Sequence, residues 1–148
     1  MKRLSLLACA MVIAGCNSYG VRPIHNEPGM TSVTVINNDR VIVPDFADVL
    51  ADAFADRGIK VRWAGSAYNP APGEYLVRYN ALRSWDFVAY LSDATVRVEK
   101  DGVTIGKGHY HHIGGSLSLD VFTKWRGTKK KMEDLYDRLL KEYQKTVP

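Results

Sequence analysis

The feature that most constrains this chain is a long stretch of alternating apolar and polar residues in its second half. Segments 74–87 and 94–100 alternate with a period of two, which is typical of half-buried strands. The dipeptide Asp101-Gly102 then gives a strong signal for a two-residue hairpin, so we expect 103–113 to return as an antiparallel strand. This pattern predicts an antiparallel sheet with one face on a core.

Two more strands and two helices complete the prediction. Segments 32–38 and 60–64 are rich in β-branched residues and are predicted strands. Between them, apolar residues at helical spacing predict a helix that begins after Pro44 and ends at Gly58. A last helix is predicted at roughly 129–145, where apolar residues again recur at helical spacing.

The order of these elements sets the expected fold class. The chain runs strand, helix, strand, three or four antiparallel strands, helix, and segment 116–122 is either a further short strand or an ordered loop. We therefore expect an α+β domain, with a mostly antiparallel sheet of four to six strands and two helices packed on one face.

The N-terminal residues predict where the protein is located in the cell. Lys2 and Arg3 precede an apolar run of about ten residues, which suits a signal peptide and is too short to cross a bilayer. The run ends in Ile-Ala-Gly-Cys at positions 13–16, which closely resembles the bacterial lipobox. The resemblance implies cleavage before Cys16 and acylation of its thiol, and several acyl chains would make a permanent anchor.

This resemblance also sets the expected boundaries. Residues 1–15 are the predicted lipoprotein signal peptide, 16–30 a lipidated tether with two prolines and two glycines, and 31–148 a single periplasmic domain. Asn17 follows the cysteine where an aspartate would imply retention at the inner membrane. The resemblance therefore implies anchoring at the periplasmic face of the outer membrane.

Charge and cysteine content narrow the function classes. Loss of Lys2 and Arg3 with the signal removes two positive charges from the net +4 of the chain and leaves +2. No basic stripe with interleaved aromatic residues is present, so nucleic-acid binding is not expected. Cys9 leaves with the signal, so neither a disulfide nor a catalytic cysteine is expected. Lysines 129–131 are either a surface for an anionic partner or a solubilising run.

The stretch GHYHHIGG is the one that suggests a ligand site. His109 and His111 are two residues apart on a predicted strand, so they share a face and are candidate ligands for zinc or copper. No third ligand is obvious beside them, although Asp93 lies across the hairpin. The alternatives for these histidines are a structural or surface role, partner binding, or a response to pH.

The face of the sheet on which these two histidines lie depends on the register of their strand. A strict register from the turn would point Lys107 inward, which is unfavourable for an unpaired lysine. We therefore expect a bulge at 106–108, which exposes His109 and His111 and turns Tyr110 and His112 toward the core.

No motif predicts catalysis. The sequence lacks the G-x-S-x-G elbow, H-E-x-x-H, a P-loop and GxGxxG, so neither enzyme activity nor a cofactor is expected. Aromatic residues near loops 66–73 and 84–92 are the better candidates for a binding patch. The aromatic residues considered are Trp63, Tyr68, Trp85, Phe87, Tyr90 and Trp125.

The element order resembles, distantly, the N-terminal domain of TolB and the lipoprotein activators of cell-wall synthases. Residues 79–125 resemble a family of small bacterial outer-membrane lipoproteins of unknown function. We expect a non-catalytic, membrane-anchored binding or assembly module for another envelope protein. The alternative is a lipoprotein that binds a small ligand or a metal through the histidines of the 109–112 strand.

Overall fold

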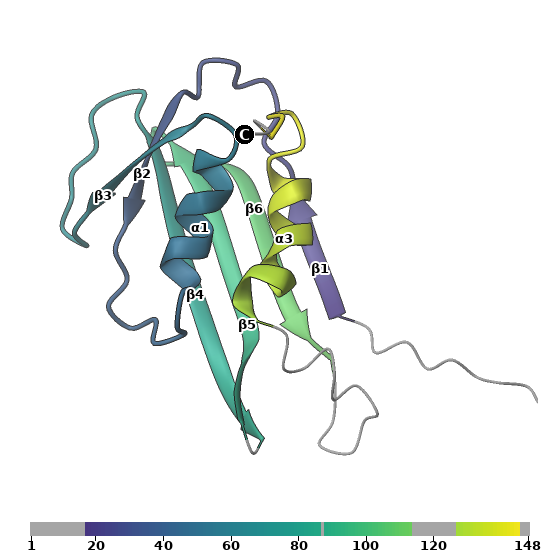
Figure 1. Cartoon of the computed structure of the whole chain (residues 1–148). Coiled ribbons are helices and arrows are strands. Elements are labelled where there is room, and N and C mark those ends of the chain that lie inside the picture. The colour runs from purple at the N-terminus through teal and green to yellow at the C-terminus, as the bar shows by residue number, and fades with distance from the viewer. Residues whose placement is uncertain (1–16, 87, 114–126, 146–148) are drawn as a thin grey trace, which may run out of the picture.

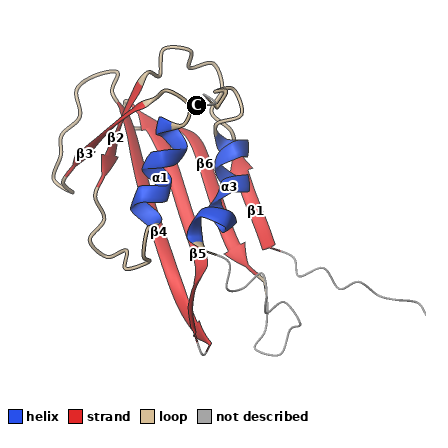
Figure 2. Ribbon diagram, in the orientation of Figure 1, coloured by secondary structure: helices blue, strands red, loops and turns tan. Residues whose placement is uncertain are grey.

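A computed structural model describes residues 17–86, 88–113 and 127–145 as a six-stranded sheet with two helices on one side (Figures 1 and 2). The strands are β1 (Asn17–Arg22), β2 (Ser32–Ile36), β3 (Lys60–Ala64), β4 (Tyr75–Asp86), β5 (Val88–Lys100) and β6 (Val103–His112). The helices are α1 (Phe46–Ala55) and α3 (Thr128–Leu139). Segment 116–122, for which a strand or loop was expected, lies outside the described residues.

The sheet is mixed, and the expected α+β class holds in its broad form. Its strand order is β1-β6-β5-β4-β2-β3. The pairs among β1, β6, β5 and β4 are antiparallel, whereas β2 runs parallel to both β3 and β4. The prediction of a mostly antiparallel sheet did not include these parallel pairs. A helix between two consecutive strands returns the chain to the end of the sheet at which the first strand started, so β2 and β3 pair in parallel.

The core lies between the two helices and one face of the sheet. The apolar faces predicted for both helices are buried except at two residues: Val49 in α1 and Tyr143, which lies beyond the end of α3, are half-buried. The three residues predicted to face inward from β5, Ala94, Val96 and Val98, meet the helices and are buried. On β4 the face that meets the helices carries the half-buried Tyr75 and the buried Val77, Tyr79 and Ala81. Gly58 has a φ of 73°, which supports its predicted role in ending the first helix. The last helix ends at Leu139, several residues earlier than predicted.

The first described strand corrects the predicted tether. Residues 17–22 form β1, which pairs along its length with β6. Tyr19 and Val21 pack against the core, and the Tyr19 hydroxyl donates a hydrogen bond to the Lys131 carbonyl at 3.0 Å. Residues 17–30, predicted to belong to the tether, thus include a strand of the sheet. The physical reason is that β6 would otherwise present an open edge, which β1 covers.

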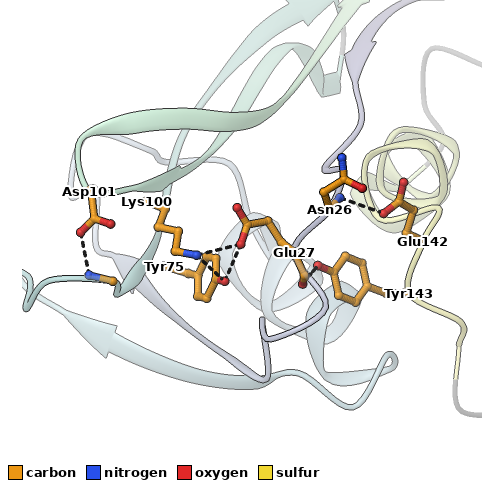
Figure 3. Close-up of polar contacts among 8 residues, drawn as sticks. Asn26, Glu27, Tyr75, Lys100, Asp101, Glu142 and Tyr143 are labelled. Atoms are coloured by element: carbon orange, nitrogen blue, oxygen red, sulfur yellow. Dashed lines mark hydrogen bonds and ion pairs between the residues drawn. The ribbon is translucent and has the colours of Figure 1, made fainter.

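The rest of the predicted tether is also fixed to the domain. Ile24 is fully buried, and the Glu27 carboxylate accepts hydrogen bonds from Tyr75 at 2.7 Å and from the Lys100 ammonium at 2.9 Å (Figure 3). The Tyr143 hydroxyl donates to the Glu27 carbonyl at 2.5 Å. The hydrogen bonds from Tyr75 and Lys100 lower the pKa of the Glu27 carboxyl. This segment therefore ties β4, β5 and the C-terminal end together.

The hairpin between β5 and β6 forms as predicted, but its bulge is displaced. Both residues of the turn at 101–102 have left-handed φ angles, 48° and 77°, as this type of hairpin requires. The register shift leaves Ile105 as the extra residue, so the bulge precedes the predicted 106–108. Its effect is the predicted one, because one extra residue exchanges the faces and buries Tyr110 and His112.

The glycines that suggested the bulge serve another purpose. Gly106 and Gly108 lie on the helix-covered face of β6. A Cβ added at Gly108 would lie 2.5 Å from Leu135 Cδ2, and one at Gly106 would collide with Ile24. The two glycines therefore let α3 and the segment before β2 approach the sheet closely.

The lysine run at the start of α3 is not a continuous surface. Lys129 and Lys130 are exposed, but Lys131 is only 2% exposed. The Lys131 ammonium donates a hydrogen bond to the Leu91 carbonyl at 3.1 Å and lies 5.2 Å from the centre of the Tyr90 ring. Lys131 thus belongs to the packing of α3 on the sheet, and the reading of all three lysines as a surface was wrong for this residue.

Candidate functional site

The two candidate metal-binding histidines lie on the open face of the sheet, opposite the helices. His109 and His111 side chains are 45% and 54% exposed, as predicted. One oxygen of Asp93 bonds to both, at 2.9 Å from His109 Nε2 and 3.1 Å from His111 Nδ1. Within the described ranges, no group of three or more histidine, cysteine, aspartate or glutamate side chains is arranged to hold a metal ion. The pair is therefore an exposed, carboxylate-bridged cluster.

A broad polar groove occupies the same open face beside the histidines. It has a volume of about 850 Å³ and is lined by residues of β4, β5, β6 and the loops that follow β2 and β3. The lining includes the cationic residues Arg40, Arg78, Arg97 and Lys107, and its one acidic member among the described residues is Asp39. This groove could not be predicted from the sequence, because its lining residues come from five separate segments.

The hairpin of β4 and β5 extends beyond the rest of the sheet (Figure 1). Among the described residues, β5 pairs with β6 no further than Asp93, and from there to Val88 its only described partner is β4. This end of the hairpin is a two-stranded ribbon, which has little intrinsic stability in water. Its length could not be read from the sequence, where β5 was expected to begin only at position 94.

The hairpin carries three of the exposed large apolar side chains of the described residues, and Trp85 has the largest exposed fraction among them. Leu82, Trp85 and Val88 are 54%, 75% and 53% exposed. A pocket of about 250 Å³ adjoins them and is lined by Val88, Tyr90 and Leu91, together with residues before α1 and at the start of α3. We call Leu82, Trp85 and Val88 the hairpin tip. Side chains alternate between faces along a strand, so Trp85 and its partner Ala89 lie on one face of the hairpin, and Leu82 and Val88 lie on the other. Exposed apolar side chains on both faces make the hairpin tip a candidate contact site.

The remaining candidate aromatic residues do not join the hairpin tip. Trp63 is exposed on β3, and Tyr68 lies in the following loop, where its hydroxyl is 2.9 Å from a Glu74 oxygen. Tyr90 is half-buried and packs edge-on against His112 with ring centres 5.4 Å apart. The predicted patch at 66–73 and 84–92 is thus divided, and Trp85 is the most exposed of its described aromatic residues.

Some predicted residues lie outside the described ranges. They are Cys16, Phe87 and Trp125, together with the whole predicted signal peptide. Among the described helices, neither has the length and apolar character needed to cross a membrane.

These features define a class of fold: a mixed α+β sheet covered on one face by two helices. No protein-family model matches the chain, and no curated protein matches its sequence. Among solved structures, the chain is similar to PelC of Paraburkholderia phytofirmans, described as a dodecamer. Identity is 14%, the TM-scores are 0.53 and 0.52 in two crystal forms, and the match covers 82% of this chain and 98% and 99% of PelC. The likeness shows a shared fold.

A minor lipoprotein from Acinetobacter baumannii is also similar, at 9% identity and a TM-score of 0.37. That match covers 77% of this chain and 92% of the lipoprotein.

Proposed function

We propose that this chain is a non-catalytic lipoprotein that assembles with other copies of itself in the bacterial envelope. In this proposal Cys16 carries the lipid anchor, and the domain lies at the periplasmic face of the outer membrane. The hairpin tip is the contact surface. The observation that carries the proposal is the exposure of Trp85 on a ribbon for which the described part of the chain supplies no third strand.

The energetics of the hairpin tip favour a protein partner. Tryptophan is among the residues that contribute most when buried at the centre of an interface. Burial of Trp85 on one face of the hairpin, and of Leu82 and Val88 on the other, removes apolar surface from water at about 25 cal/mol per Å². A partner would also supply the packing that the two-stranded ribbon lacks.

The fold comparison supports a second copy of this chain as the partner. PelC, whose fold this chain shares over most of both lengths, is described as a dodecamer. A subunit that assembles in a ring uses two different surfaces of each copy, so one side chain can face a pocket of its neighbour. The 250 Å³ pocket beside Val88 is suitable for an apolar contact of this kind.

The test compares Trp85→Ser with a matched control, Trp63→Ser, which also removes an exposed tryptophan but lies on β3. Full-length protein is purified in non-ionic detergent, its mass is measured by light scattering, and copies are cross-linked in cells. We expect the wild type and the control to form the same oligomer, and Trp85→Ser to dissociate. A monomeric wild type, or equal loss in both variants, would contradict the proposal.

The anchor is tested separately. Mass spectrometry of the mature wild type should show an acylated N-terminal cysteine, and density-gradient fractions should place it with outer membranes. Cys16→Ala should lose both the acyl mass and the membrane association. An unmodified Cys16 in the wild type would refute the lipoprotein assignment without bearing on the hairpin tip.

The alternative function uses the exposed histidines. One observation favours it: His109 and His111 converge on a single Asp93 oxygen. Zinc titration of the wild type against the His109→Ala/His111→Ala double variant decides the matter. Equal affinities would exclude a metal or small-ligand site at these histidines.

A further inference from the structure

A row of cationic residues crosses four adjacent strands of the sheet. Arg78 of β4 is paired with Arg97 of β5, Arg97 with Lys107 of β6, and Lys107 with Arg22 of β1. The four residues share the open face, because their neighbours along each strand point toward the helices. Adjacent strands lie about 4.8 Å apart, so the row spans roughly 14 Å. We call these four residues the cationic row.

Among the described residues, the two central members of this row, Arg97 and Lys107, have no ion-pair partner. Arg78 is paired with Glu99 at 3.1 Å, and Arg22 donates to the Thr104 carbonyl at 2.5 Å. Among the residues that the structure describes, no carboxylate oxygen lies within 4.0 Å of Arg97 or Lys107. Like charges directly opposite each other destabilise a sheet. A face of the sheet whose only role is contact with water would not require like charges to be placed opposite each other.

The surroundings of the row form a shallow binding surface. Three of its members line the 850 Å³ groove, and Arg40 from the loop after β2 adds a further cation. Asn80 and Thr95 supply neutral hydrogen-bonding groups beside them. The one acidic lining residue of the described groove, Asp39, already accepts a hydrogen bond from the Asn37 amide at 2.6 Å. The groove therefore favours negative charge along its length.

We propose that the cationic row binds a linear polyanion that carries carboxylate or phosphate groups along its chain. The row presents charges one strand apart in a line, which matches anionic groups repeated along an extended polymer better than a single small anion. Electrostatic attraction also releases counterions from such a polymer, and that release drives binding. The inference goes beyond the proposed function, because the hairpin tip and the cationic row are separate surfaces.

The experiment uses the full-length protein in non-ionic detergent and two polymers, polygalacturonate for carboxylates and polyphosphate for phosphates, with neutral dextran as a blank. The row variant is Arg97→Gln/Lys107→Gln. The matched control, Lys129→Gln/Lys141→Gln, removes the same charge from two exposed lysines at α3 and just after it. Affinity is measured by fluorescence anisotropy at several salt concentrations.

We expect the wild type and the control to bind at least one polyanion with similar affinity. The row variant should bind at least about tenfold more weakly, and its slope of log affinity against log salt should be smaller by about two. The polymer bound more tightly identifies carboxylate or phosphate as the anionic group. Melting temperature checks folding, and the row variant should melt no lower than the wild type because like-charge repulsion is relieved.

Three results would overturn the inference. One is that neither polyanion binds the wild type at low salt. Another is that the row variant and the lysine control lose affinity equally, since net charge alone would then explain binding. The third is binding to detergent micelles that contain phosphatidylglycerol but to neither polymer, which would assign the open face to a lipid surface. None of these results depends on whether Trp85 mediates assembly.

Discussion

Replacement of Gly108 by alanine tests how closely the last helix approaches the sheet. The added Cβ would lie 2.5 Å from Leu135 Cδ2 and 2.9 Å from its Cγ. Leu135 is fully buried on α3, so its side chain cannot turn into solvent to make room. An added methyl group in a core packed this tightly costs about 1–3 kcal/mol.

The expected loss is large enough to measure by thermal unfolding. For a domain of this size, 1 kcal/mol corresponds to about 3–5 °C in Tm, so Gly108→Ala should lower Tm by roughly 3–15 °C. The control is Gly20→Ala on the neighbouring strand β1, where the nearest described atom to the added Cβ is His109 Cβ at 4.0 Å. Its effect should stay within about 0.5 kcal/mol.

A double variant separates steric conflict from any general intolerance of alanine in β6. Leu135→Val alone removes packing and destabilises the protein, but it also opens space above position 108. In the double variant Gly108→Ala/Leu135→Val, the measured loss of stability should be smaller than the sum of the two single-variant losses by about 1 kcal/mol or more. Strictly additive losses, or an equal loss in Gly20→Ala, would refute the close-approach explanation.

Two further predictions concern buried polar groups. Tyr136 is buried, which raises the pKa of its phenol, and its hydroxyl has no hydrogen-bond partner among the described residues. Tyr136→Phe should therefore raise the free energy of unfolding, measured by urea titration, by about 1 kcal/mol. A clear loss of stability in this variant would show that the hydroxyl has a partner. The Glu27 pKa is lowered from its ordinary 4.5, so its contribution to stability is present above pH 4.5 and is lost as the pH falls through the folded-state value. Glu27→Gln should be less stable than the wild type at pH 7, and the difference should shrink at lower pH; a gap that stays constant from pH 7 to pH 3 would contradict this assignment.

The sequence predicted those elements whose signals are local. The alternation of β4 and β5, the Asp101-Gly102 turn and the spacing of Phe46 and Leu50 in α1 each specify local structure without knowledge of the rest of the chain. The inward-facing residues of β5 followed from the same alternation. These parts of the fold depend on periodicity and turn chemistry, which neighbouring residues determine.

Other features depend on distant partners and were missed. β1 contains Gly20 and precedes Pro23, and it becomes a strand because β6 offers an edge for it. Lys131 is buried because the Leu91 carbonyl and the Tyr90 ring lie opposite it. Such features require the tertiary arrangement, which overrides local propensity.

Of the candidate sites, too, one was predicted from local sequence and another was missed. The exposure of His109 and His111 was predicted from the need to keep Lys107 out of the core, although the bulge that achieves it lies at Ile105. The cationic row was not foreseen, because its members are brought opposite each other only by the register of four strands. A one-residue error in that register would place Lys107 on the opposite face.

The place where β1 begins has a consequence for maturation. Under the proposed acylation, the cleaved bond lies just before Cys16, one residue from a strand that is fully paired with β6. A membrane peptidase needs this part of its substrate extended and unpaired. Under this proposal β1 joins the sheet after cleavage, and β6 keeps an open edge while the chain is still attached to its signal peptide. Completion of the sheet would then coincide with release into the anchored, mature form.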